Sequence, residues 1–527
     1  MTISIVLKDK MDRIVKAPLR IYDSIERDMV DHRTVKVSMV AALLVYHALL
    51  VLGVIFAQWT PDWSAIDGYT IWDNWISDLG GSKYTVPHTP LPILYDLACV
   101  FAGALTIPLT FFLEGIVAPR DSNMSRWRLR LASLGFLFGL VGNIGYIGVG
   151  VFSEDRNFWG LHGITSALAF GGFVVSGFFI ALCALIYRTR IPKKVGIYML
   201  FVPPMTIVLQ ALPAVVPAVS GPLMEWMLLF SILGWVDPLS IITLAGFRRE
   251  EEIRKHGGAV EPPAHQQKGM EWVPVRRFLR KKLDFLKMIA DRLEGVYTDE
   301  KVFKVVAWAG IVACPALLLA GILVAASGGF SIGIDAPTAL GSVAFTPAPW
   351  LFDAFCIVIG VLAIPAVYYF EKQLAPLPDQ LGGDLSRPRY KLTTYGLVLG
   401  ILGSFGFVIL GIFSRDRPVK AGHYTVPVFA YAEIAGCIAF ALAFMCIGEC
   451  ILLYETGHPK VLGLYGLLGP FIALVAWAAT RTALAEWLVL FAIIAFMVLL
   501  LASCMARTCK AGTGLPVKGT TKPGDGK

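Results

Sequence analysis

A polar pattern that could bind a ligand or carry out hydrolysis stands twice in this chain, each time at the end of a glycine-rich apolar stretch. It consists of a serine, an aspartate, an arginine and a histidine at fixed spacing. The two copies are Ser153, Asp155, Arg156 and His162, and, 261 positions later, Ser414, Asp416, Arg417 and His423. Serine and aspartate side chains cap turns by binding backbone N–H groups, and arginine can pair with an acid or a lipid phosphate. Serine, histidine and aspartate are also the residue types of a hydrolytic triad.

Turn-building, ligand contact and hydrolysis therefore all remain open for this pattern. No nucleophile motif surrounds Ser153 or Ser414, so the sequence favours a role other than catalysis. A metal or haem site at the two histidines would need further ligands, and only His88 offers itself. The nine cysteines fall in or beside apolar segments without the spacing of a metal site or a disulfide framework. We expect no metal and no cofactor.

Glycines precede both copies of the polar pattern at the same spacing. They are Gly135, Gly139, Gly142, Gly145 and Gly150, and then Gly396, Gly400, Gly403, Gly406 and Gly411. Matches at a constant offset without a gap predict a tandem duplication. Glycines three and four residues apart share one helical face, where a neighbouring membrane helix can approach closely. A groove for a lipid chain is the alternative for that face.

Composition predicts a membrane protein. The chain is 56% hydrophobic and 16% charged, whereas a soluble domain carries about 25% charged residues. Stretches long enough to cross a bilayer, about 20 apolar residues each, number twelve. They lie at 35–57, 91–117, 131–152, 161–187, 195–218, 222–246, 303–326, 349–370, 392–413, 424–453, 460–480 and 484–507. The predicted fold is an all-α polytopic membrane protein with twelve transmembrane helices in two parallel six-helix repeats, because an even number of spans gives both halves the same orientation.

Five regions follow from these spans. They are a cytoplasmic N-terminal segment (1–34), the first repeat (35–246), a cytoplasmic linker with an amphipathic helix (247–302), the second repeat (303–507) and a disordered cytoplasmic tail (508–527). Basic residues concentrate in the loops after predicted spans two, four, eight and ten, which places both termini in the cytoplasm of a cell-membrane protein. The net charge of +8 reflects this asymmetry and anionic lipid, so nucleic acid is not an expected partner. The N-terminus lacks the pattern of a signal peptide.

The outer ends of several predicted spans carry polar residues that we expect to gather in one rim on each repeat. In the first repeat they are Ser77, Asp78, Asp96, Ser153, Asp155, Arg156, His162 and Glu225. In the second they are Asp353, Ser414, Asp416, Arg417, His423 and Glu486. The loop of the second repeat reads APTALGSVAF and lacks the Ile-Ser-Asp of the first. We predict that Asp155 and His162 lie on the side of that loop, within contact range of its acidic or basic neighbours.

The order of these motifs resembles a family. Ile76-Ser77-Asp78-Leu79-Gly80, the pair Tyr95-Asp96 and a glycine-rich helix that ends in Gly-x-Phe-Ser-x-Asp resemble an uncharacterised family of bacterial and archaeal membrane proteins, related to the Frag/DRAM-type six-helix superfamily. The common family form has proline where Ser153 and Ser414 stand, and often asparagine at Asp96. The resemblance implies a six-helix fold, and relatives in GPI-anchor lipid remodelling and lysosomal-membrane regulation.

Ionisable residues also fall inside the predicted spans. They are His47, Asp237, Glu433 and Glu449. Such residues usually face a bundle interior or a cavity, either as a proton or cation route or as neutralised partners in interhelical hydrogen bonds.

Four functions stay open on the sequence. The first is binding or handling of lipid at the outer rim, with membrane lipids as partners. The second is secondary transport through the buried carboxylates, which predicts a water-accessible cavity. The third is a non-catalytic subunit or assembly factor with protein partners in the membrane. The fourth is a membrane-embedded hydrolase or transferase, which predicts a nucleophile and a base within hydrogen-bond reach.

Overall fold

The computed structural model forms two compact units, residues 20–284, and residues 285–527 together with 1–19. Its described residues are 2–58, 69–81, 91–119, 124–187, 189–211, 221–256, 288–376, 387–417, 419–421 and 424–512, with 282 and 285. The expected first repeat falls in one unit and the expected second repeat in the other. The N-terminal segment is the helix α1 (Thr2–Val30). We call the unit of residues 20–284 the first unit and the other the second unit.

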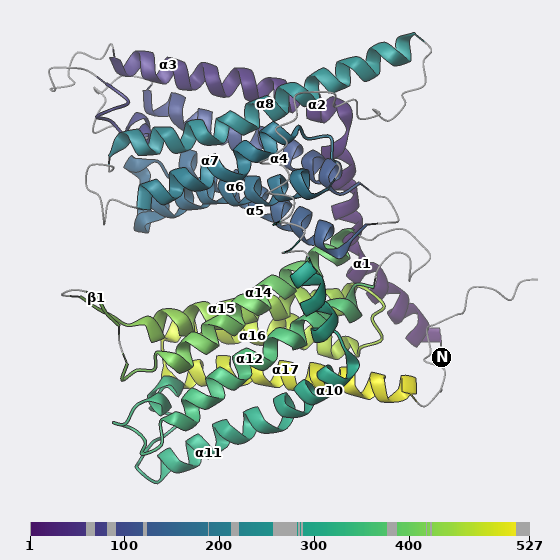
Figure 1. The fold of residues 1–527 in the computed structure, drawn as a ribbon, viewed down its shortest axis with the longest axis vertical. Coiled ribbons are helices and arrows are strands. Elements are labelled where there is room, and N and C mark those ends of the chain that lie inside the picture. Colours follow the sequence, from purple (N-terminus) through teal and green to yellow (C-terminus); the bar gives the residue numbers. More distant parts are fainter. Residues whose placement is uncertain are drawn as a thin grey trace, which may run out of the picture. The chain divides into compact units, whose positions relative to one another are not determined.

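The first unit is a bundle of long helices (Figure 1). They are α2 (His32–Ala41), the π-helical turn η1 (Ala42–Tyr46), α3 (His47–Gln58), α4 (Leu91–Val117), α5 (Arg126–Val151), α6 (Leu161–Ile186), α7 (Lys193–Ala211) and α8 (Pro222–Lys255). α2, η1 and α3 follow one another without a break and form one long helix, which packs against α4. Each later helix packs against the next one along the chain, and α8 returns to contact α2 and α6.

The second unit has the same order of elements and the same neighbours. Its helices are α10 (Glu300–Trp308), the π-helical turn η8 (Ala309–Ala313), α11 (Cys314–Ala326), α12 (Trp350–Leu374), α14 (Arg387–Ile412), α15 (Val428–Leu453), α16 (Lys460–Thr480) and α17 (Ala483–Gly512). α14 packs between α12 and α15, as α5 packs between α4 and α6, and α17 contacts α10. A π-helical turn therefore interrupts the first long helix of each unit at nearly the same place.

Eleven helices among the described residues are long and apolar enough to cross a membrane. They correspond to eleven of the twelve expected spans, with boundaries that differ by a few residues, and by up to nine at the end of α8 (Lys255). The missing one is the stretch expected at 195–218. Its described part is α7, which begins with two lysines and contains Pro203 and Pro204, and residues 212–220 lie outside the described residues.

One departure from an all-helical fold is a short antiparallel hairpin of β1 (Val419–Ala421) and β2 (Tyr424–Val426). The span expected to begin at 424 therefore begins at Val428, the first residue of α15. The predicted span included the residues of β2 because Tyr-Thr-Val-Pro-Val is as hydrophobic as the start of a helix. Its β-branched residues nevertheless favour a strand. Of the amphipathic linker helix, only 282, 285 and the helical residues 288–297 are described, and His423 lies outside the described residues.

Glycines bring the central helices of the first unit into backbone contact. A Cβ added at Gly145 of α5 would lie 2.4 Å from Ala169 N of α6, and one at Gly172 would lie 2.4 Å from Gly142 N. On the other side of α5, a Cβ at Gly150 would lie 2.3 Å from Asp96 O of α4. No side chain fits at these points. The glycine face thus serves close helix packing, and side chains such as Phe173 fill the space around it.

Two glycines of the α5–α6 pair allow a matched test of this packing. We expect Gly145→Ala to destabilise the protein by about 1–3 kcal/mol because the new methyl group must push α6 away. Gly171→Ala on α6 has nothing within 4 Å of its added Cβ and should leave stability unchanged or slightly higher. The thermal midpoint of unfolding in detergent measures both. Equal midpoints for the two variants would contradict the backbone contact.

The loop between α15 and α16 folds onto the last turns of α17 in the second unit. His458 in this loop is 6% exposed, and its Nδ1 lies 2.8 Å from Ser503 Oγ. Arg507 Nη1 donates to the carbonyl of Thr456 in the same loop. Burial and, to a smaller extent, the positive charge of Arg507 together lower the pKa of His458 to about 4. The folded protein therefore holds His458 neutral.

This histidine makes stability depend on pH. An unfolded histidine binds a proton near pH 6.5, whereas folded His458 does so only near pH 4. Its contribution is fully present above about pH 6.5 and is lost as the pH falls toward 4, because the unfolded state then binds the extra proton. We expect the thermal midpoint to fall between pH 7.5 and 5, and to fall less in His458→Gln. An equal fall in both proteins would show that other groups cause it.

Candidate functional site

The loop that carries the Ile-Ser-Asp motif is held to the N-terminal end of α8. Its turn η2 (Ile76–Gly80) begins where Asp78 Oδ2 accepts the Trp75 N–H at 2.8 Å. Glu225 Oε2 on α8 accepts the Ile76 N–H at 2.9 Å, and a backbone hydrogen bond from Ser77 also reaches Glu225. The loop therefore uses Asp78 and Glu225 as acceptors for backbone groups that would otherwise have no partner.

Aromatic residues complete this attachment. Trp226 Nε1 donates to Asn74 O at 3.1 Å, and Tyr69 OH donates to Trp75 O at 3.0 Å. The Tyr69 and Trp226 rings meet edge to face. Burial raises the pKa of Tyr69, and the charges of Asp78 and Glu225 raise it further, so its hydroxyl stays a donor.

An arginine clasp joins the end of α5 to α4. Arg156 lies in the short turn η4 (Glu154–Arg156), and its Nε donates to Ser153 Oγ at 3.1 Å. Its Nη2 donates to Asp96 on α4 and to Gly150 O at 3.0 Å. We call Asp96, Ser153 and Arg156 the first clasp. It neutralises a partly buried carboxylate and caps the last turn of α5, so its three side chains are engaged within the protein.

The second unit contains a matching clasp. Arg417 Nε donates to Ser414 Oγ at 3.0 Å, and its Nη2 donates to Asp353 and to Gly411 O at 3.4 Å. We call Asp353, Ser414 and Arg417 the second clasp. The aromatic attachment also has a counterpart, since Trp487 Nε1 donates to Asp335 O at 2.8 Å. The sequence-predicted rim residues that meet in both units are thus one aspartate, one serine and one arginine.

The corresponding loop of the second unit is not attached to Glu486, the counterpart of Glu225, in the same way. Its turn η9 (Pro337–Gly341) has proline where the first has Ile76, and proline offers no N–H to Glu486. Glu486 instead shares a side-chain hydrogen bond with Glu433 of α15, which requires a proton on one of the two carboxyls. Both acids line a cavity of about 410 Å³ with Cys437. Asp416 takes over part of the loop attachment and accepts from Ser342 Oγ and Val343 N, each at 2.7 Å.

The remaining predicted residues differ in position, and Asp155 stands in the same turn as Arg156. His162 Nδ1 lies 2.8 Å from Phe152 O, and its N–H donates to Asn157 Oδ1 at 3.0 Å. Asp155 is exposed in η4. Glu449 is partly buried on α15, and it lines neither the cavity beside Glu433 nor the larger cavity of the first unit. Because Ser153 Oγ accepts from Arg156 and His162 turns to a carbonyl, the first rim does not arrange its serine and histidine as nucleophile and base.

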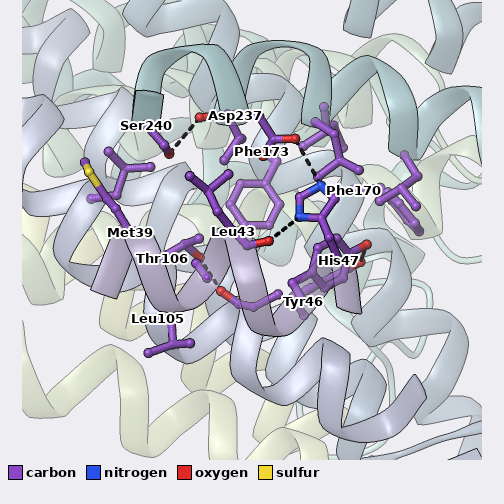
Figure 2. Close-up of a pocket in the computed structure, with 18 residues that line it drawn as sticks. Met39, Leu43, Tyr46, His47, Leu105, Thr106, Phe170, Phe173, Asp237 and Ser240 are labelled. Atoms are coloured by element: carbon purple, nitrogen blue, oxygen red, sulfur yellow. Dashed lines mark hydrogen bonds and ion pairs between the residues drawn. The ribbon is translucent and has the colours of Figure 1, made fainter. Parts of the chain in front are cut away.

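A larger cavity lies inside the first unit (Figure 2). About 660 Å³ of space not filled by protein atoms, part of it open to the outside, lies between its walls, which are almost entirely apolar. The residues that line it come from α2 to α6 and α8. They are Met39, Ala42, Leu43, Tyr46, His47, Ala102, Leu105, Thr106, Leu109, Tyr146, Phe170, Phe173, Leu229, Ile232, Leu233, Val236, Asp237 and Ser240. Of the residues predicted from the sequence, His47 and Asp237 therefore share one site.

These two side chains meet in the cavity wall. His47 Nε2 lies 3.1 Å from Asp237 Oδ2, and His47 Nδ1 lies 2.8 Å from Leu43 O (Figure 2). Leu43 belongs to the π-helical turn η1, whose i→i+5 hydrogen bonds displace carbonyls from the regular pattern. The irregular turn thus supplies the acceptor that orients the imidazole toward α8.

Neutral polar groups complete the cavity. The hydroxyls of Tyr46 and Tyr146 lie 2.7 Å apart. Thr106 Oγ1 donates to Asn143 Oδ1 at 2.6 Å, and Asn143 Nδ2 donates to Thr110 Oγ1 at 2.9 Å, which ties α4 to α5. The tyrosines and Thr106 were missed at the sequence level. A polar residue at helical spacing from His47 or Asn143 would have been the only signal, and it is weak inside an apolar run.

The cavity pair belongs to the first unit alone. Ala48-Leu49-Leu50 aligns with Ala316-Leu317-Leu318 at an offset of 268, which puts Pro315 in place of His47. The offset of 261 puts Val498 in place of Asp237. The two units therefore share the clasp and differ in their cavities, one with a histidine–aspartate pair and the other with two glutamates.

Comparison with known protein families finds a match within the first unit. Residues 37–236 match the Frag1/DRAM/Sfk1/Cwh43P N-terminal domain family. The match runs from α2 to α8 and includes the Ile-Ser-Asp loop, the first clasp and His47, and it ends one residue before Asp237. No curated protein and no solved structure matches the chain. The match agrees with a multi-pass membrane protein related to the Frag/DRAM superfamily.

The clasps can be tested as structural devices. We expect Arg156→Gln and Arg417→Gln each to destabilise the protein by about 1–3 kcal/mol, because each leaves a partly buried carboxylate without its charged donor. Arg190→Gln, in an exposed ion pair with Glu250 at 3.4 Å, should change stability by about 0.5 kcal/mol or less. Thermal unfolding in detergent measures all three. If the clasp variants unfold at the same temperature as the control, the clasps do not hold the rims together.

Proposed function

We propose that this protein binds and handles membrane lipid, and that the cavity of the first unit accepts the lipid chain. The observation that carries this proposal is the shape of the cavity and its apolar lining. Along α8 its wall extends from Leu229 to Ser240, eleven residues, which is about 16 Å at 1.5 Å per residue. One leaflet of the hydrocarbon core is about 15 Å thick. The cavity thus has the length of an acyl chain in one leaflet.

Its lining also suits such a ligand, since the walls are almost entirely apolar. Pockets of this kind combine apolar walls with a few polar groups that orient the ligand, as His47 and Asp237 do here. The proposal moves the lipid site from the rim, which the sequence had suggested, to the space beneath it.

The rim then acts as the frame of the site. Glu225 anchors the Ile-Ser-Asp loop one helical turn before Leu229, where the cavity wall begins. We propose that the loop closes the outer end of the cavity while the first clasp keeps α4 and α5 in register. Membrane lipids are the proposed ligands, and protein partners in the membrane remain compatible with this function.

The wider proposal concerns topology. We propose twelve spans in two tandem repeats, with both termini in the cytoplasm of a cell-membrane protein. The matching clasps, the matching tryptophan attachments and the π-helical turn in each unit support a duplication. The basic loops support the orientation.

A second candidate function is proton-coupled transport. It is favoured by the pairing of His47 with Asp237 beside a cavity deep within the helices, since ionisable groups at such depth often mark proton pathways. Proteoliposomes with an imposed pH gradient distinguish the two. Proton flux that requires Asp237 would favour transport, and its absence alongside retained lipid would favour lipid handling.

Two alanines of α4 give a matched test of the lipid site. Ala102 lines the cavity, whereas Ala104 on the same helix is exposed and does not. We expect Ala102→Phe to fill the cavity and to reduce the lipid that stays with the purified protein several-fold, as measured by mass spectrometry after extensive detergent washing. Ala104→Phe should retain as much lipid as the wild type. Equal lipid content in both variants, with unchanged thermal midpoints, would contradict binding in the cavity.

A further inference from the structure

The hydrogen-bond contacts of His47 and Asp237 determine where the protons of this pair can lie. A carbonyl oxygen only accepts, so His47 Nδ1, at 2.8 Å from Leu43 O, carries a hydrogen. The contact of 3.1 Å between His47 Nε2 and Asp237 Oδ2 then needs one more proton. It resides either on Nε2, as an imidazolium facing a carboxylate, or on Asp237, as a carboxylic acid facing a neutral imidazole. In both cases the pair as a whole is uncharged.

The rest of the cavity adds no charge. Among the eighteen described residues that line it, none is lysine or arginine, and Asp237 is the one acid. Tyr46, Tyr146, Thr106 and Ser240 contribute neutral hydroxyls. A phosphate or carboxylate head would therefore meet no unpaired cation here, and an ammonium head would meet no unpaired anion.

The position of His47 and Asp237 along their helices also favours an uncharged ligand. Asp237 lies twelve residues from Glu225 at the rim and fourteen from Glu251, which pairs with Lys36 at 2.9 Å at the opposite end of α8. His47 lies eleven residues from both Lys36 and Gln58. Twelve residues span about 18 Å, so the pair lies near the middle of a hydrocarbon core of about 30 Å. A charged headgroup stays at the bilayer surface, whereas an uncharged one can reach this depth.

We infer that the cavity selects an amphiphile with an uncharged, hydrogen-bonding head, such as an alcohol, over phospholipids and fatty acids. This inference rests on the proposed function and names its ligand class. The hydroxyl of the ligand donates to Asp237, whose Oδ1 is not used in the contact with His47, and its chain runs along α8 toward Leu229. The Thr106 and Ser240 hydroxyls already donate their hydrogens to protein oxygens, so they, like Asp237, can meet a ligand hydroxyl as acceptors.

Matched probes with one chain and three heads test the charge selection. Hexadecanol, hexadecyl phosphate and hexadecylamine are added to the purified full-length protein in neutral detergent, and bound adducts are counted by native mass spectrometry. We expect the wild type to bind hexadecanol about tenfold more tightly than either charged probe, a difference of about 1.4 kcal/mol.

Single variants should reverse this preference in opposite directions. Asp237→Asn leaves an imidazole without its counter-charge and should favour hexadecyl phosphate. His47→Gln leaves a carboxylate without its partner and should favour hexadecylamine. The double variant carries two neutral amides and should return to hexadecanol, which also shows that the variants fold. Thermal midpoints of all four proteins provide the check on folding.

The outcomes separate the two proposals. If the wild type binds all three probes equally and Ala102→Phe weakens all of them, the cavity binds amphiphiles without selecting their charge, and the inference on ligand class is wrong. The same conclusion follows if the single variants keep the ranking of the wild type. If no probe binds the wild type, or if Ala102→Phe binds as well as the wild type, the proposed lipid site itself fails.

Discussion

Backbone contact between the central helices is the interaction on which each unit depends. In a bilayer no hydrophobic force draws helices together, so their association depends on close packing and on hydrogen bonds between them. Gly145 meets the backbone of α6, and Gly150 meets that of α4. In the second unit, a Cβ at Gly406 would lie 2.6 Å from Gly436 Cα. α5 is therefore packed between α4 and α6, and α14 between α12 and α15, with backbone contact in each unit.

The rims follow from this packing. Because the end of α5 touches α4 at Gly150, Arg156 just beyond it reaches Asp96 and the carbonyl of Gly150 together. The clasp repeats with the same atoms at Arg417 because the same glycine contact, at Gly411, repeats beneath it. Of the three interpretations of the polar pattern, turn-building fits these contacts, because the arginine donates to a carbonyl in the last turn of the helix, where backbone acceptors need donors.

The cavity arises where the glycine contact is absent. Between the long helix α2–α3 and α8, the facing residues are large or branched, and η1 breaks the regular spacing of side chains. Helices there stay apart and leave an apolar space with one neutral pair of ionisable groups. The second unit has Pro315 and Val498 in place of that pair, and it has Glu433 next to Glu486, where Pro337 offers no backbone donor. The two units therefore share a frame and differ in their interiors.

The sequence by itself determined the helical membrane fold, the matching motifs of two halves and the glycine face of α5. These depend on local properties: long apolar runs must form helices in lipid, and glycines at helical spacing must share a face. It also placed Asp96, Ser153 and Arg156 among the eight residues expected at one rim, because chain topology brings those loops to one end of a bundle, and the structure joins these three by hydrogen bonds. The sequence did not predict the strand that begins at Tyr424, because apolar composition does not distinguish a hairpin with β-branched residues from the start of a helix.

Only the tertiary structure decided that His47 and Asp237 form a pair. They stand 190 positions apart on helices that meet through the return of α8 onto α2. No pattern in the chain signals the rotation of each helix about its axis, and that rotation selects which side chains face a common space. The π-helical turn that orients His47 is equally invisible in the sequence, because a carbonyl displaced by one residue changes the backbone pattern without changing the hydrophobic one.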